Sequence, residues 1–423
     1  MQPANRLALD GGTPVCTTPL RPAWPPMNAD IENQLIQQAR TAVSIYNRSG
    51  IVEKFEGAFA SYIGRGRALA TSSGTAALHS IYHGAQVGPG DEVILCDYGF
   101  FATATPITFL GACPVFVDAT ANGTIAAERV SAAITQRTKA VVATHMWGQP
   151  ADMDALTALC QSRGLVLFED CSHAHGSRLH GQVVGSFGSA AAWSMQGKKT
   201  VSAGEGGVLV TADEDIYERA LLLGHFNARA LQDIPVTSPH RDLAFTGIGL
   251  KYRAHPLALA MALPQLLTLD TLIDGRQKGA EVLIEALQSI PGVSILSRSS
   301  AASIHSYYAL IALIDASQAG FDRRQFLSAM EAENVFFADI PGQMGSMSNL
   351  PVFRRREKPS AVGSLDHSLR ITEQAVKFFV PAIGLDRHGA DEAATVAEAI
   401  RKVCHLLAKS SQRHSERNSV AGR

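Results

Sequence analysis

A carboxylate and a lysine, each placed just after an apolar run, could together support covalent chemistry on a cofactor. Asp170 follows the run at 165–168, and Lys199 follows the run at 190–195. Pyridoxal phosphate needs a lysine to hold its aldehyde as a Schiff base and a carboxylate to keep its ring nitrogen protonated. If both runs are strands of one sheet, the two side chains can meet at one rim, where the glycines within 204–207 admit the cofactor. On residue type alone, a surface aspartate and a solvated lysine are the open alternative.

A turn of small hydroxyl residues and glycine at 71–75 could bind the phosphate of such a cofactor. The turn follows a predicted strand at 67–70 and opens a predicted helix that runs to Tyr82. The first N–H groups of a helix have no partner within the helix, and the helix dipole favours an anion there. Serine and threonine also cap helices without binding any ligand, so the turn alone is a weak signal.

The order and spacing of these segments resemble one known family. EDCSHAHG at 169–176, WSMQGKKTVSAGEGG at 193–207 and SSGTAAL at 72–78 resemble segments of the DegT/DnrJ/EryC1/StrS aminotransferases. The resemblance implies fold type I and pyridoxal phosphate as the cofactor. In that family the lysine that holds the cofactor stands five residues after a serine. Ser194 plus five is Lys199, so the resemblance selects Lys199 rather than Lys198.

The resemblance also implies roles for further residues. It places Asp170 at the pyridine nitrogen, Phe100 against the face of the pyridine ring and Lys199 at the point of attachment. His173 stands where many members have glutamine, and a ring there can still hydrogen-bond or stack. The family has an asparagine that reaches the partner subunit's phosphate, and this chain has Lys251 at that position. The contacts implied for the phosphate are Gly74, Thr75, Ala76, Ser194 and, from the other subunit, Lys251.

Five more residues have two open interpretations. Trp24 could line the site or pack, and Arg253 could bind an anion or form an ordinary salt bridge. His145 resembles a family turn, and a structural role is the simpler interpretation. His305 and Tyr307 could touch substrate or pack in the core.

Apolar runs alternate with helical patterns between residues 67 and 211, which predicts βα units and a mainly parallel sheet. Ligands bind such sheets at the carboxyl ends of the strands. The predicted fold class is α/β: fold type I, with a mainly parallel large-domain sheet and a smaller C-terminal α+β domain. We expect an extended N-terminal arm at 1–30, a large cofactor-binding domain at 31–260, a connecting helix and small domain at 261–408, and a disordered tail at 409–423.

Composition limits the possible partners. The 423 residues are 46% hydrophobic and 18% charged, as in a globular protein. The net charge of −1 gives no field that favours nucleic acid, and no long uncharged apolar stretch predicts a membrane span. Six cysteines stand without metal-binding spacing. We therefore expect no nucleic acid, membrane or metal partner and a reducing, cytoplasmic location.

By resemblance, the protein is expected to be an aminotransferase with a ping-pong mechanism. Glutamate or glutamine would give its nitrogen to a nucleotide-linked keto-sugar or a keto-cyclitol, and a homodimer with shared sites is implied. A sugar dehydratase is one alternative, although that branch of the family replaces the lysine with histidine. A non-catalytic regulator on the same fold is another, and the presence of Lys199, Asp170 and Ser194 together argues against it. GEGG does not match the GxGxxG of nicotinamide enzymes.

Overall fold

The computed structural model describes residues 6–21, 24–25, 27–296, 303–354, 361–379 and 389–421. Its largest element is an eight-stranded sheet, of which β10 is antiparallel to both of its neighbours while the remaining pairs are parallel. The predicted α/β class with a mainly parallel sheet is confirmed. In spatial order the strands are β1 (Arg67–Thr71), β10 (Gly207–Thr211), β9 (Ala190–Ser194), β6 (Val166–Asp170), β5 (Thr138–Thr144), β2 (Glu92–Cys96), β4 (Cys113–Val117) and β16 (Ala361–Val362).

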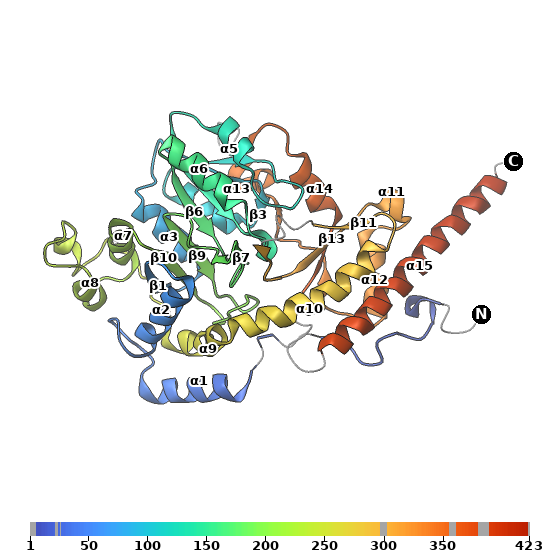
Figure 1. Ribbon diagram of the computed structural model, residues 1–423, viewed down its shortest axis with the longest axis horizontal. Helices are drawn as coiled ribbons and strands as arrows, with labels where there is room; N and C mark the ends of the chain where they lie inside the picture. Colours follow the sequence, from blue (N-terminus) through green and yellow to red (C-terminus); the bar gives the residue numbers. More distant parts are fainter. Residues whose placement is uncertain are drawn as a thin grey trace.

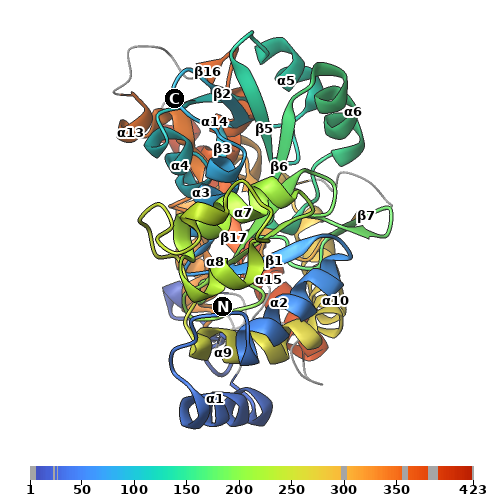
Figure 2. The same cartoon turned by 90° about the vertical axis from the view of Figure 1, so that its left-hand side faces the viewer.

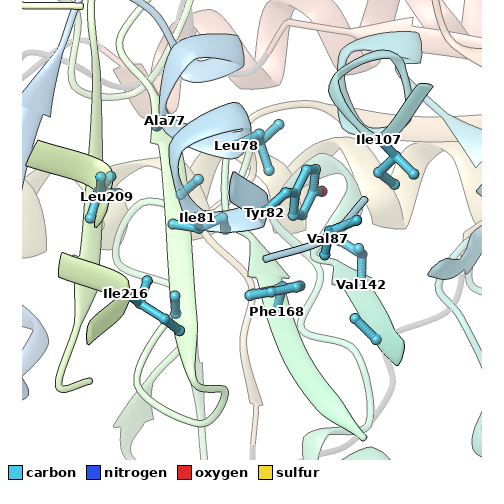
Figure 3. Packing of buried hydrophobic residues seen from close by; sticks show 14 of the residues in the cluster. Ala77, Leu78, Ile81, Tyr82, Val87, Ile107, Val142, Phe168, Leu209 and Ile216 are labelled. Atoms are coloured by element: carbon cyan, nitrogen blue, oxygen red, sulfur yellow. The ribbon is translucent and has the colours of Figure 1, made fainter. Parts of the chain in front are cut away.

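Helices cover both faces of this sheet because its buried strands present apolar side chains alternately to each side. Figure 3 shows one face, where Leu78, Ile81 and Tyr82 of α3 pack over Phe168 and Val142 of the sheet. On the opposite face, α1 and α2 both pack on α9 (Figures 1 and 2). The helices around the sheet are α1 (Ala29–Thr41), α2 (Gly50–Ile63), α3 (Gly74–Gly84), α4 (Thr105–Phe109), α5 (Ala127–Ala133), α6 (Met153–Arg163), α7 (Glu214–Gly224), α8 (Ala228–Asp233) and α9 (Pro256–Leu267).

A second, four-stranded antiparallel sheet carries the C-terminal part of the chain. Its order is β11 (Val293–Ile295), β13 (Leu310–Ile314), β17 (Ala375–Phe378) and β14 (Ala338–Asp339). The long helices α10 and α15 lie side by side next to it (Figure 1). The helices of this part are α10 (Leu269–Gln288), α11 (Ala316–Ala319), α12 (Arg323–Ala332), α13 (Pro351–Arg354), α14 (Asp366–Gln374) and α15 (Gly389–Ala421). The division of the chain at residue 260 stays a prediction.

The C-terminal part of the chain also pairs with segments of the larger part. β16 is the edge strand next to β4 in the eight-stranded sheet. Two short strand pairs add to this connection. β15 (Gly345–Ser346) pairs with β3 (Tyr98–Gly99). β12 (Ser303–Ile304) pairs with β7 (Arg178–Leu179), and β7 also pairs with β8 (Gln182–Val183). The C-terminal part of the chain is therefore joined to the larger part by backbone hydrogen bonds as well as by the chain itself.

Two expectations about the chain ends need correction. In the N-terminal arm, Leu7 and Cys16 are buried in the core of the small sheet, and the backbone N–H groups of Ala8 and Val15 donate to the Glu333 carboxylate. At the other end, α15 continues to Ala421, so 409–421 is helical rather than disordered. A helix that packing has already nucleated can extend through polar residues because propagation costs far less than nucleation.

Among the described residues, no single helix is long and apolar enough to cross a membrane. Only α9 and α10 taken together reach the required length and composition, and they are bent by 64°.

Candidate functional site

The carboxyl ends of three strands meet at one edge of the large sheet. Gly207 of β10 pairs with Thr71 at the end of β1 on one side and with Ser194 at the end of β9 on the other. β9 runs parallel to β6, whose last residue is Asp170. This topology brings together the turn at 71–75, Ser194 and Asp170, as the predicted sheet requires.

A cavity of about 610 Å³ opens at this edge, between the two sheets. Its floor consists of strand ends and the turn at 73–75, and its opposite wall comes from β14, β17 and the residues after β14. The lining residues used below are Ser73, Gly74, Thr75, Phe100, Thr103, Trp147, Asp170, His173, Ser194, Lys198, Lys199, Tyr308, Asp339 and Lys377.

Asp170 lies buried at the base of the cavity with each carboxylate oxygen held by one donor. The Thr103 hydroxyl donates to Oδ2 at 2.6 Å, and the Ser172 N–H donates to Oδ1 at 3.0 Å. Both bonds fix the orientation of the carboxylate. Asp170 can therefore offer a negative charge to a protonated ring nitrogen.

Lys199 is the buried member of the lysine pair, with 9% of its surface exposed, whereas Lys198 is exposed. Its Nζ lies 4.8 Å from the centre of the Tyr308 ring. Burial lowers the pKa of Lys199 to about 8, because the charged amine loses hydration; Asp170 raises this pKa and Lys377 lowers it. An amine with such a pKa loses its proton near neutral pH and can act as a nucleophile or a base.

The turn before α3 offers unpaired backbone donors. Ser73 is the N-cap, and its hydroxyl accepts the N–H of Ala76 at 3.0 Å. In the described part of the chain, the N–H groups of Gly74 and Thr75 donate to no protein acceptor. Ala76 does not line the cavity, and its N–H is already bonded to the cap. Ser194 lines the cavity next to Gly74, as the resemblance implied.

Aromatic rings line one side of the cavity. His173 stacks on Tyr308, at 4.1 Å, and on Trp147, at 5.2 Å, and these two rings are themselves 6.0 Å apart. Its Nδ1 accepts the backbone N–H of Trp147 at 3.4 Å. Burial, followed by the charge of Lys199, lowers the pKa of His173 well below its ordinary value, so the ring is neutral. Phe100 also lines the cavity and lies against Phe101. His173 therefore both stacks and hydrogen-bonds.

Several cavity residues were not singled out from the sequence. Thr103 orients Asp170, Tyr308 lies under Lys199, and Lys377 forms an ion pair of 2.8 Å with Asp339 on the opposite wall. Thr103 lies three residues after Phe100, so the segment around Phe100 that leads into the next helix could have indicated Thr103 as well. Tyr308, just before β13, and Lys377, in β17, are distant in sequence from the large-sheet residues, and only tertiary structure brings them here.

Other candidates lie outside the cavity. Lys251 is exposed, and Tyr252 beside it accepts the Ser72 N–H at 2.7 Å, which places Lys251 near the phosphate turn. Arg253 lies over the Tyr46 ring at 5.0 Å. Lys251 therefore contributes nothing to the cavity of its own chain, and its role toward a partner's phosphate stays a prediction.

The histidine and tyrosine candidates have structural contacts. His145 is fully buried; its Nε2 bonds to Glu169 at 3.0 Å and its Nδ1 accepts the Ala151 N–H at 3.0 Å. His305 and Tyr307 stack on each other at 4.0 Å and do not line the cavity. Packing is the better interpretation for all three.

The cavity fits pyridoxal phosphate by its donor set and its backbone shape. A Cβ on Gly74 would lie 2.6 Å from the Ser194 Cβ, and a Cβ on Gly207 would lie 2.3 Å from the Ser73 carbonyl carbon, so two glycines are required for the turn to approach the strands this closely. The cavity thus combines unpaired N–H groups for a phosphate, an oriented carboxylate and a buried amine.

Solved structures share this fold over nearly the whole chain. The structure of DesI with its TDP-sugar product is 28% identical, with a TM-score of 0.79 over 97% of this chain and 99% of that one. The structure of 3-amino-5-hydroxybenzoic acid synthase is 26% identical, with a TM-score of 0.78 over 93% and 100%. Fold and cavity together define a pyridoxal phosphate-dependent aminotransferase of fold type I, which confirms the predicted cofactor and enzyme class.

The sequence model of the DegT/DnrJ/EryC1/StrS aminotransferase family matches residues 28–400, and the chain belongs to this family. The L-glutamine:2-deoxy-scyllo-inosose aminotransferase of Micromonospora echinospora is 32% identical, covering 87% of this chain and 90% of that protein. The L-glutamine:scyllo-inosose aminotransferase of Streptomyces griseus is 33% identical over 78% and 80%. GDP-perosamine synthase of Escherichia coli O157:H7 is 30% identical over 75% and 84%.

Proposed function

We propose that this aminotransferase moves the amino group of L-glutamine or L-glutamate to the ketone of a keto-cyclitol, with a nucleotide-linked keto-sugar as the second candidate acceptor. The observation that carries the chemistry is the buried Lys199, which shares a cavity with the oriented Asp170 carboxylate. The cyclitol is favoured because the relative that covers 87% of this chain is named for an inosose substrate. The GDP-perosamine relative supports the second candidate.

Pyridoxal phosphate, when bound, supplies an electron sink for the bond that breaks at the donor Cα. The residues of this chain that would hold it are Gly74, Thr75 and Ser194 at the phosphate, Asp170 at the ring nitrogen and Lys199 at the aldehyde.

Lys199 has two tasks in this proposal. It would hold the cofactor at its aldehyde carbon until the donor's amine replaces it, and its freed amine would then take the proton from the donor Cα and deliver it to that aldehyde carbon. Burial favours the neutral amine that this second task needs, and the Tyr308 ring lies 4.8 Å from the amine. The acceptor's ketone then receives the nitrogen in the same cavity, with Lys199 moving the proton in reverse. One base in one cavity is consistent with a ping-pong mechanism.

The test combines spectroscopy with product analysis. Purified protein, loaded with pyridoxal phosphate, should show a visible band that L-glutamine abolishes and that scyllo-inosose then restores, with an amino-cyclitol detected by mass spectrometry. Lys199→Ala should lose both band changes. Lys198→Ala is the matched control, because Lys198 lines the same cavity but is exposed. Absence of a visible band in the wild type would refute the enzyme proposal, and restoration only by a nucleotide-linked keto-sugar would reassign the acceptor.

We also propose a homodimer with shared sites. Large apolar side chains are exposed beside the cavity and in the loop before α9, among them Phe109 (76% exposed), Phe245 (62%) and Ile248 (46%). His79 contacts both Phe109 and Tyr252, so the end of α4 and the turn that carries Lys251 lie next to each other. A second copy that covers this surface would bring Lys251 toward the partner's phosphate turn.

Mixed dimers test whether Lys251 serves the partner. A dimer of one Lys199→Ala chain and one Lys251→Ala chain contains one site with both lysines intact if Lys251 acts across the interface. Co-expression of the two variants should therefore restore activity that each lacks or has reduced alone. If Lys251 acts within its own chain, neither site is intact and no activity returns.

We also propose a cytoplasmic location, since all six cysteines are free thiols.

A further inference from the structure

Arg276 of α10 is a fully buried cation that has no carboxylate partner among the described residues. Only 1% of its surface is exposed, and its single hydrogen bond runs from Nη1 to the Thr200 hydroxyl at 2.8 Å. Within the described part of the chain, Nε and Nη2 have no hydrogen-bond partner and no carboxylate pairs with the guanidinium. A buried charge without compensation costs stability, so a purely structural purpose does not explain this residue.

Arg229 is the matched comparison within the same molecule. It is also buried, but it makes two hydrogen bonds to the Glu56 carboxylate, another to Asp233 and a fourth to the Tyr217 hydroxyl. Its carboxylate neighbours raise its pKa, whereas burial lowers the pKa of Arg276 to about 9. Arg229 therefore belongs to a complete ion-pair network, and Arg276 does not.

The contacts of Arg276 converge on the backbone of Lys199. Thr200, its hydrogen-bond partner, is the residue after Lys199. The guanidinium carbon also lies 5.0 Å from the centre of the Trp24 ring, and the Trp24 indole N–H donates to the Lys199 carbonyl at 3.0 Å. Trp24 comes from the N-terminal arm and packs edge-on against Phe379. Trp24 thus holds the peptide carbonyl of Lys199, and Arg276 holds the side chain of Thr200, the next residue.

We propose that Arg276 and Trp24 are positioning residues, which act through Thr200 and the Lys199 backbone to keep the Lys199 amine in the cavity. Lys199 must release its hold on the cofactor, move a proton and reattach in every turnover, so its side chain moves while its backbone has to stay in place. The Arg276–Trp24 clamp supplies a fixed backbone without placing another charged group in the cavity. The inference rests on the proposed role of Lys199.

Arg276→Met separates this role from a structural one by the sign of its effect on stability. If Arg276 only supported the fold, its loss would lower the melting temperature and leave the chemistry of correctly folded protein unchanged. Under the proposal, removal of an uncompensated buried charge leaves the melting temperature equal or higher. Lys199 of the cofactor-free variant should nevertheless attach added pyridoxal phosphate about tenfold more slowly than Lys199 of the wild type, because misplacing a reacting group slows its reaction by at least about this factor. Lys278→Met, at an exposed position of the same helix, should change neither quantity.

Trp24→Phe tests the other half of the clamp and serves if Arg276→Met does not fold. This variant keeps a ring beneath Arg276 but removes the N–H that bonds to Lys199, so attachment should slow about threefold to tenfold, as for one lost hydrogen bond. Attachment at the wild-type rate in both folded variants would overturn the clamp. A wild-type protein that forms no visible band at all would instead refute the proposed function, so the two failures are distinguishable.

Discussion

Gly74→Ala should weaken cofactor binding because the added Cβ has no room. An ideal Cβ on Gly74 would lie 2.6 Å from the Ser194 Cβ and 2.8 Å from the Ser194 Cα. The second of these atoms belongs to the backbone of β9 and cannot rotate away. The first turn of α3 would have to move by about 1 Å to reach ordinary contact distance, and it carries the free N–H groups of Gly74 and Thr75 with it.

The expected size of the effect follows from that displacement. Overpacking of a tight contact costs about 1–3 kcal/mol of folding stability. A displacement of about 1 Å in a positioning group costs about 100-fold in function, so we expect the dissociation constant for pyridoxal phosphate to rise about 10-fold to 100-fold. The change in affinity should exceed the change in stability, since the moved atoms face the cavity.

Absorbance titration with pyridoxal phosphate and denaturation with urea measure the two quantities. Gly57→Ala is the matched control: Gly57 lies on the exposed side of α2, and a Cβ there would meet nothing within 4 Å. This control should bind the cofactor as the wild type does and gain about 0.5–1 kcal/mol of stability, because alanine favours helix. Wild-type affinity in Gly74→Ala would show that the turn at 73–75 does not hold the phosphate.

Three further predictions concern buried polar groups. In cofactor-free protein, the stability of the wild type relative to Lys199→Met should rise by up to about 3 kcal/mol between pH 8 and pH 10.5. In this pH range the lysine of the unfolded chain still holds a proton that the lysine of the folded protein has lost. Urea titrations at several pH values would measure the difference, and a difference that does not change with pH contradicts the prediction. Thr103→Val should slow the reaction with glutamine about threefold to tenfold, since Asp170 loses the 2.6 Å bond that orients it; stopped-flow absorbance would measure the rate. Glu169→Gln should destabilise the protein by about 3–5 kcal/mol in urea denaturation. The Glu169 carboxylate accepts the N–H groups of Gly185, Phe187 and Gly188, and the amide of glutamine would turn a donor toward these donors. A loss below about 1 kcal/mol would contradict this reasoning.

The parts of the site that lie on the large sheet were predictable from local sequence. Apolar runs that alternate with helical patterns put Asp170 and Ser194 at strand ends, and the rules of parallel sheets then put these ends at one edge. The choice of Lys199 over Lys198 came from the resemblance. The structure adds a physical difference between them, since Lys199 is buried and Lys198 is exposed.

The opposite wall of the cavity was not predictable, because nothing local marks it. Lys377 and Asp339 lie on strands of the small sheet, where a charged residue at a strand surface looks like any solvated side chain. Arg276 stands in a helical pattern in which a buried cation is not expected. The clamp also depends on Trp24, which lies far from Lys199 in sequence and reaches it only through the fold of the N-terminal arm.

The position of β16 has a consequence for synthesis of the chain on the ribosome. β4 is complete by residue 117, but among the described residues its outer edge is paired by 361–362 alone, nearly 250 residues later in the chain. Until that segment emerges, the nascent large sheet presents an open edge, and open edges pair readily with other chains. Folding of the large sheet can therefore finish only after residue 362 has been synthesised, and a chain truncated before residue 361 would keep an aggregation-prone edge.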